Sequence, residues 1–181
     1  MFTIHTEQSA PAPSREALAG IRERIGFIPN LAATIAGSPV ALAGFGAMQE
    51  TLRGSSLRAL EREVVGVTVS LENRSPYSMA AHSTFAAGAG ASREVVAALR
   101  AGEPLPDERL ESLRAFTTAL LRDRGHVGDG FGLSAEEQLE VVAQVAYTTF
   151  ANLVANRART PVDEAFASQA WEEHGIVVSP L

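Results

Sequence analysis

Cysteine and lysine are both missing from this chain of 181 residues, so all fifteen basic residues are arginines. Without cysteine the protein can form no disulfide, no thiolate nucleophile and no cysteine-ligated zinc site, whatever its fold. Without lysine it can form no Schiff base with a carbonyl substrate, and it lacks the lysine of a phosphate-binding P-loop. These absences exclude several large classes of enzyme before any motif is considered.

Long apolar runs and basic clusters are also missing. No stretch of about 18 uncharged apolar residues could span a bilayer. The opening MFTIHTEQSAPAPS has neither the basic start nor the apolar middle of a signal peptide. The formal net charge is −6, and no run of basic residues offers a surface for nucleic acid or anionic lipid. We therefore expect a soluble cytoplasmic protein whose partners are small molecules or other proteins, with no nucleic acid and no membrane.

Strand signals are scarce, whereas Gly, Pro and Ser interrupt the chain at helix-length intervals. Hydrophobic residues make up 46% of the chain, which is enough to bury a core within one domain. We predict a single all-α domain over residues 1–181, with an extended tail over 1–13 and a helical core over 14–175.

Capping residues predict where the helices begin and end. Helix starts are predicted at Ser14, Asn30, Ser38, Ser56, Asp107, Ser134 and Asp163. Glycines at 26, 37, 102 and 125 predict helix ends, and the last predicted helix reaches His174 and Gly175.

The segment LRALEREVVGVTVSLEN, residues 57–73, carries apolar residues at the three- and four-residue spacing of one buried helix face. Glu63 lies about 40° around this helix from Val67, so it borders the apolar stripe. A carboxylate in that place can be partly desolvated and suited to proton transfer, or it can lie on the solvated shoulder beside Arg62.

The stretch NRSPYSMAAH, residues 73–82, combines a helix start with two polar groups on one face. Ser75 followed by Pro76 is what the beginning of a helix favours. Ser78 and His82 are four residues apart, so they share a face and could hydrogen-bond as a hydroxyl and a base. The other histidines lie in tail, loop or helix-end positions, and none pairs at metal-ligand spacing, so we expect no cofactor and no metal.

Taken together, the spacing of Glu63, Ser75, Ser78 and His82 resembles that of the alkylhydroperoxidase D-like and carboxymuconolactone decarboxylase superfamily. The resemblance extends to IGFIPNLAATIAGSPVALAGF, LRALEREVVGVTVSLENR and FANLVANRARTPVD, and it covers roughly residues 20–165. In the redox-active members of the superfamily, both serine positions are cysteines.

The resemblance implies an all-helical subunit that assembles into homotrimers or homohexamers. It places Ser78 at the peroxidatic position, Ser75 at the resolving position, Glu63 as the base and His82 as its relay partner. Tyr77 stands where some members have a second relay histidine.

Ser75 and Ser78 leave open two explanations of how serine came to stand at these positions, and three functions for the chain. A serine hydroxyl is barely ionised near neutral pH and cannot pass through the oxidation states of peroxide reduction. Either a natural branch abandoned redox chemistry, or both cysteines were replaced by their nearest isostere. The chain is then a redox-silent relative of antioxidant thiol peroxidases, or a cysteine-independent acid–base enzyme, or a non-catalytic oligomeric scaffold. The acid–base enzyme would use Glu63 and His82 on a small lactone or carboxylic acid, although the helix of the serine motif offers no arginine to bind a carboxylate.

Overall fold

The computed structural model describes residues 2–171 of the chain, and within them it contains helices and no strand. The predicted all-α class is therefore confirmed. The α-helices are α1 (Ala12–Ile25), α2 (Asn30–Ile35), α3 (Pro39–Leu52), α4 (Ala59–Glu72), α5 (Pro76–Gly88), α6 (Arg93–Ala101), α7 (Glu108–Arg122) and α8 (Ala135–Ala158). A 3₁₀-helix, η1 (Glu164–Gln169), follows them. The predicted end of the last helix at residues 174 and 175 lies outside the described residues.

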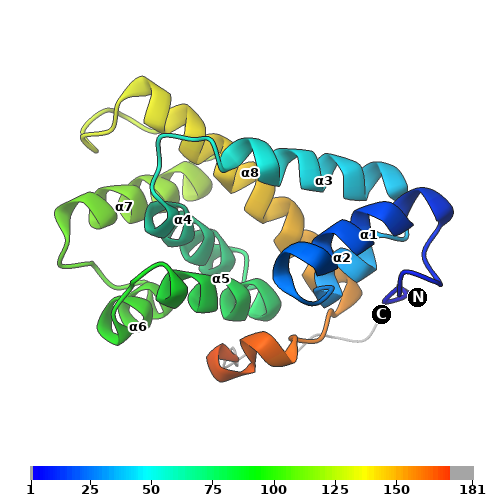
Figure 1. The fold of residues 1–181 in the computed structure, drawn as a ribbon. Helices are drawn as coiled ribbons and strands as arrows, with labels where there is room; N and C mark the ends of the chain where they lie inside the picture. Colours follow the sequence, from blue (N-terminus) through cyan, green and yellow to red (C-terminus); the bar gives the residue numbers. More distant parts are fainter. Residues whose placement is uncertain (1, 172–181) are drawn as a thin grey trace.

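The hairpin of α4 and α5 lies at the centre of the molecule (Figure 1). The helix α8 has 24 residues and crosses the whole molecule, with α3 running beside it. Helices α6 and α7 lie at one end, and α1 and α2 lie at the other. This arrangement gives α4 and α5 neighbours on several sides, so many of their side chains are buried.

Two apolar clusters meet at α5. One cluster packs the valines of α4 against α7 and the first half of α8. The other packs α1 and α2 against the second half of α8 and Phe166 of η1. Tyr77 belongs to the second cluster and Met79 to the first. The first turn of α5 therefore packs against both clusters.

Three of the predicted caps are confirmed by side-chain hydrogen bonds. The hydroxyl or carboxylate at Ser38, Asp107 and Ser134 accepts a bond from the backbone N–H three residues ahead, and Ser134 forms a full capping box with Glu137. Gly26 and Gly102 end α1 and α6 in the left-handed region, at φ of 87° and 72°. A glycine at these positions avoids the steric clash that a Cβ atom would cause.

Two predicted serine caps are wrong because each hydroxyl bonds a distant partner. The helix α1 begins at Ala12, before Ser14, and the Ser14 hydroxyl donates to the carbonyl of Ala36 at 2.8 Å. The helix α4 begins at Ala59, and the Ser56 hydroxyl donates to a carboxylate oxygen of Glu140 on α8 at 2.6 Å.

The predicted caps at Asn30 and Asp163 belong to one long-range contact. Asn30 is the first residue of α2, and its side chain donates to the carbonyl of Pro161 at 3.1 Å. Asp163 precedes η1 but forms no cap bond; its carboxylate accepts the Asn30 backbone N–H at 3.0 Å and the Tyr77 hydroxyl at 2.6 Å. These contacts tie the segment after α8 to α2 and α5.

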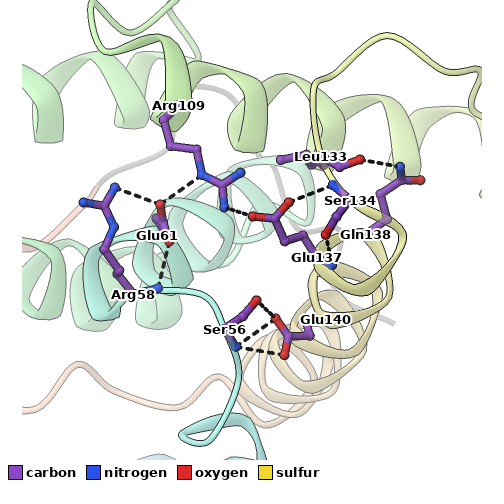
Figure 2. A network of polar contacts seen from close by, with 9 residues as sticks. All are labelled: Ser56, Arg58, Glu61, Arg109, Leu133, Ser134, Glu137, Gln138 and Glu140. Carbon is purple, nitrogen blue, oxygen red and sulfur yellow. Dashed lines mark hydrogen bonds and ion pairs between the residues drawn. The ribbon is translucent and has the colours of Figure 1, made fainter.

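A network of charged side chains holds the start of α4 (Figure 2). Glu61 is 3% exposed and accepts bonds from the backbone N–H and side chain of Arg58, both at 2.8 Å, and from Arg109 of α7 at 3.0 Å. Arg109 also donates to Glu137 of α8 at 2.5 Å. Burial alone would raise the pKa of the Glu61 carboxyl, but the hydrogen bonds from Arg58 and Arg109 outweigh it and lower the pKa to about 2.

This shift predicts how stability depends on pH. The folded pKa of Glu61 lies below its unfolded value, so the stabilisation is complete above about pH 4.3 and is lost as the pH falls towards 2. We expect Glu61→Gln to lower the free energy of unfolding at pH 7 by about 3 kcal/mol. The loss should shrink below pH 3, as measured by urea unfolding. The control is Glu50→Gln, whose side chain is 74% exposed in its pair with Arg53. This control should change stability by less than about 0.5 kcal/mol. A Glu61→Gln loss as small as that of the control would contradict the prediction.

Candidate functional site

Helices α4 and α5 bring Glu63 and His82 into direct contact. The Nδ1 atom of His82 lies 2.7 Å from Oε2 of Glu63, and the two side chains are 21% exposed for Glu63 and 11% for His82. When the imidazole is neutral, a proton on Nδ1 bonded to the carboxylate leaves the lone pair on Nε2. No residue between 2 and 171 hydrogen-bonds Nε2. The pair therefore has the geometry of an oriented base whose reactive nitrogen is available to a bound molecule.

The imidazole of His82 packs on the backbone of α4 at Gly66. A Cβ atom built on Gly66 would lie 2.5 Å from Nδ1 of His82 and 2.7 Å from Cε1, closer than real Cβ contacts. On its other side the ring meets the edge of Phe85, with ring centroids 6.2 Å apart. The ring is thus held between α4 and α5 in the orientation that contacts Glu63.

Ser75 and Ser78 both lie at the start of α5 with buried hydroxyls. Ser75 occupies the predicted cap position, but its hydroxyl makes no cap bond. The two residues are 0% and 2% exposed, and neither hydroxyl has a hydrogen-bond partner in the described part of the chain. The expected bond from Ser78 to His82 is therefore not formed, because the Nδ1 side of the imidazole faces Glu63 on α4 instead.

Tyr77 is engaged away from the Glu63–His82 pair. Its hydroxyl donates to Asp163 at 2.6 Å and accepts the backbone N–H of Leu31 at 3.3 Å. Burial, followed by the hydrogen bond to Asp163 and the negative charge of that residue, raises the pKa of the phenol. Tyr77 thus connects α5 to α2 and to the segment after α8.

One solvent-open groove, with a volume of about 1390 Å³, brings most of the predicted site residues together. Glu63, Tyr77, Ser78 and His82 line it, whereas Ser75 does not. The apolar part of the wall includes Phe27, Leu31, Leu42, Phe45, Phe85 and Phe166. A small molecule in this groove would contact apolar side chains along its wall, with polar groups to orient it.

Tyr147 of α8 lines the same groove and was not found by sequence reasoning. It is 9% exposed, and its ring stacks on Phe45 with centroids 4.7 Å apart. Burial, and then the negative charge of Glu63, raise the pKa of its phenol against the opposing effects of Arg53 and Gln49. Tyr147 therefore keeps its proton and can donate a hydrogen bond inside the groove.

Arginines also reach the groove from helices other than α5. Arg24 of α1, Arg53 directly after α3 and Arg62 of α4 line it. Arg53 is half exposed and forms a 3.3 Å pair with Glu50. The lack of an arginine on the helix of the serine motif therefore does not leave the groove without cationic groups, because the fold supplies them from other segments.

The described residues contain neither a cluster of metal-ligating side chains nor a membrane-spanning helix. Between residues 2 and 171, no group of three or more His, Asp or Glu side chains could hold a metal ion. None of the helices described is long and apolar enough to cross a membrane.

The fold is shared with several solved structures. An alkylhydroperoxidase AhpD core, an uncharacterized peroxidase-related protein from Ralstonia eutropha JMP134, has a TM-score of 0.81 and 20% identity, covering 91% of this chain and 93% of that one. An uncharacterized peroxidase-related protein from Silicibacter sp. TM1040 has a TM-score of 0.75 and 20% identity, covering 88% and 89%. The debrominase Bmp8, in a cysteine-to-alanine variant bound to 2,3,4-tribromopyrrole, has a TM-score of 0.77 and 18% identity, covering 93% and 95%. No family model and no curated protein sequence matches the chain.

Proposed function

We propose that this chain, which has the alkylhydroperoxidase D-like fold, is a cysteine-independent acid–base enzyme of the alkylhydroperoxidase D-like and carboxymuconolactone decarboxylase superfamily. The observation that carries the proposal is the 2.7 Å contact between Glu63 and His82 at the wall of the groove. A partly enclosed carboxylate that orients an imidazole is more than helix packing requires. It favours chemistry over a purely structural scaffold.

The proposed reaction is proton transfer at a carbon next to a carbonyl. Nε2 of His82 removes the proton, and Glu63 stabilises the imidazolium through Nδ1. The negative charge then moves to the carbonyl oxygen of the substrate. Tyr147 lines the same groove and supplies a hydroxyl donor that can stabilise this oxyanion. Return of the proton from His82 to the product carbon regenerates the base.

The groove favours a small lactone or carboxylic acid with an apolar body. Its aromatic walls suit a ring, and Arg24 and Arg53, which also line it, offer a guanidinium to a carboxylate. The tribromopyrrole held by the debrominase variant is a small substituted ring bound to a protein of this fold. We propose that the groove of the present chain also binds a small ring.

Thiol peroxidase activity is not expected from this sequence. The chain contains no cysteine, and the residues at the two redox positions are Ser75 and Ser78. We therefore expect no consumption of an organic hydroperoxide in the presence of dithiothreitol beyond the rate in buffer.

Solvent deuterium exchange tests the acid–base function without knowledge of the physiological product. The protein is mixed in D₂O with a panel of γ-lactones and lactone carboxylic acids, and exchange at the carbon next to the carbonyl is followed by proton NMR. We expect enzyme-dependent exchange with at least one member of the panel. Glu63→Gln and His82→Asn should each slow it by about 100-fold, the usual size of a general-base contribution.

Matched controls distinguish the specific effect of losing Glu63 or His82 from general damage to the protein. His126→Asn changes an exposed loop histidine and Glu103→Gln changes an exposed carboxylate, and neither residue lines the groove, so both variants should retain the exchange rate. Exchange that never exceeds buffer with any panel member would refute the proposal. So would exchange that survives both Glu63→Gln and His82→Asn.

A further inference from the structure

The solvent-exposed face of α8 carries an apolar row. Leu139, Val142, Phe150 and Leu153 are 70, 44, 37 and 60% exposed, and Ala146 lies between them. The steps along the row are three, four, four and three residues, so the side chains line one face of the helix. Soluble monomers rarely leave a contiguous apolar face of this kind uncovered.

The row is symmetric about Ala146. Four residues away in either direction lie Val142 and Phe150, and seven residues away in either direction lies a leucine. The charges at the ends are opposite: the exposed Glu136 precedes the row and the exposed Arg157 follows it. If a second copy of α8 packed antiparallel across a two-fold axis at Ala146, leucine would meet leucine, Val142 would meet Phe150, and Glu136 would approach Arg157.

The neighbouring surface suits such a contact. Ala146 is small, so two helix axes crossing there can approach to about 8 Å. Helix α3 runs beside α8 (Figure 1) and adds Val40, which is 84% exposed. Between the two helices lies a hollow of about 350 Å³, lined by Val40, Phe45, Met48 and Phe150 among others. This hollow can receive side chains of an opposing copy.

We propose that the row from Leu139 to Leu153 is a two-fold interface between two copies of this chain, with their α8 helices antiparallel and crossing at Ala146. Identical patches meet in such an interface, as two-fold symmetry requires, and the opposite charges at its ends fix the antiparallel direction. Arg157 also packs over the ring of Phe2 in its own subunit, 5.5 Å from the centroid, which holds its side chain at this end of the row.

Single cysteines test the axis directly, because the chain has none of its own. Under mild oxidation, Ala146→Cys is expected to form a disulfide-linked dimer of about 38 kDa, twice the chain mass of 19.1 kDa, on a non-reducing gel. Leu139→Cys lies on the same row but seven residues from the axis, which separates its two copies by about 21 Å. A disulfide needs Cα atoms within about 7 Å, so Leu139→Cys should not cross-link.

Light scattering tests the contact in the unmodified protein at micromolar concentration. The wild type should have an even number of subunits, and Leu153→Glu should halve its mass. Ile25→Glu introduces the same charge at a residue 47% exposed on α1, and it should leave the mass unchanged. Glu136→Arg and Arg157→Glu should each weaken the assembly at least tenfold, and the two changes together should restore it.

Several results would overturn this interface. A monomeric wild type, a Leu153→Glu variant of unchanged mass, or efficient cross-linking through Leu139→Cys but not Ala146→Cys would each do so. Circular dichroism of every variant confirms that the helices are retained. The test uses mass and cross-linking only, so its failure is independent of the proposed acid–base function.

Discussion

Replacing both Ser75 and Ser78 with cysteine is expected to turn a protein without thiol peroxidase activity into one that consumes an organic hydroperoxide in the presence of dithiothreitol. We expect a rate at least 100-fold above that of free cysteine. The reason lies in the place of the two residues. Ser75 is the N-cap of α5 and Ser78 lies in its first turn, where the helix dipole favours a thiolate. The Glu63–His82 pair lines the same groove as Ser78 and can accept the thiol proton.

The chemistry of the double variant follows from these positions. The thiolate at position 78 attacks the terminal oxygen of the hydroperoxide, and the O–O bond breaks. The departing alkoxide takes back the proton that the Glu63–His82 pair accepted from the thiol, and it leaves as an alcohol. The sulfenic acid formed is then attacked by the thiol at position 75, which releases water and closes a disulfide. Dithiothreitol reduces this disulfide and becomes oxidised itself. A stopped-flow or colorimetric assay measures hydroperoxide loss, and mass spectrometry detects the intramolecular disulfide.

Single variants separate the roles of the two positions. Ser75→Cys alone should remain nearly inactive, because residue 75 does not line the groove.

The double variant should also be no less stable than the wild type, since each serine hydroxyl is buried without a partner among the residues described. An unpartnered buried hydroxyl costs about 1–3 kcal/mol, and a thiol costs less to bury. A folded double variant with accessible thiols that reacts no faster than free cysteine would rule out a redox site of this geometry.

Sequence periodicity predicted the helices well but not all of their ends. Ser38, Asp107 and Ser134 cap as predicted because their partners are three residues away, and that distance is visible in the sequence. Ser14 and Ser56 do not, because each found a partner on another part of the fold. Local patterns contain no information about such tertiary competition.

The same limit applies to the candidate site. The spacing from Glu63 to His82 pointed to a shared site, and the structure places these two side chains in contact. Tyr147 and the arginines of the groove come from α1, α4, α8 and the end of α3, and no spacing in the sequence joins them to the serine motif. In the sequence alone, Tyr147 within a long helix suggests only core packing. The fold is needed to show that it lines the groove.

Gly66→Ala is expected to disable the site as fully as loss of His82, although Gly66 carries no functional group. Its new Cβ would lie 2.5 Å from Nδ1 and 2.8 Å from Cγ of the imidazole, so either the ring or the backbone of α4 must move. Movement of the ring breaks the bond to Glu63. We expect a loss of deuterium exchange of about 100-fold. Overpacking should also lower the free energy of unfolding by about 1–3 kcal/mol.

A double-mutant cycle with His82 isolates the cause. In a His82→Ala background the imidazole is gone and the new methyl group has room, so Gly66→Ala should then cost little stability. Gly88→Ala is the matched control: it lies at the end of α5, and nothing lies within 4 Å of its built Cβ. This control should keep both activity and stability. If Gly66→Ala destabilises the protein equally with and without His82, contact with the imidazole is not the reason for the glycine. In that case Gly66 does not position the base of this site.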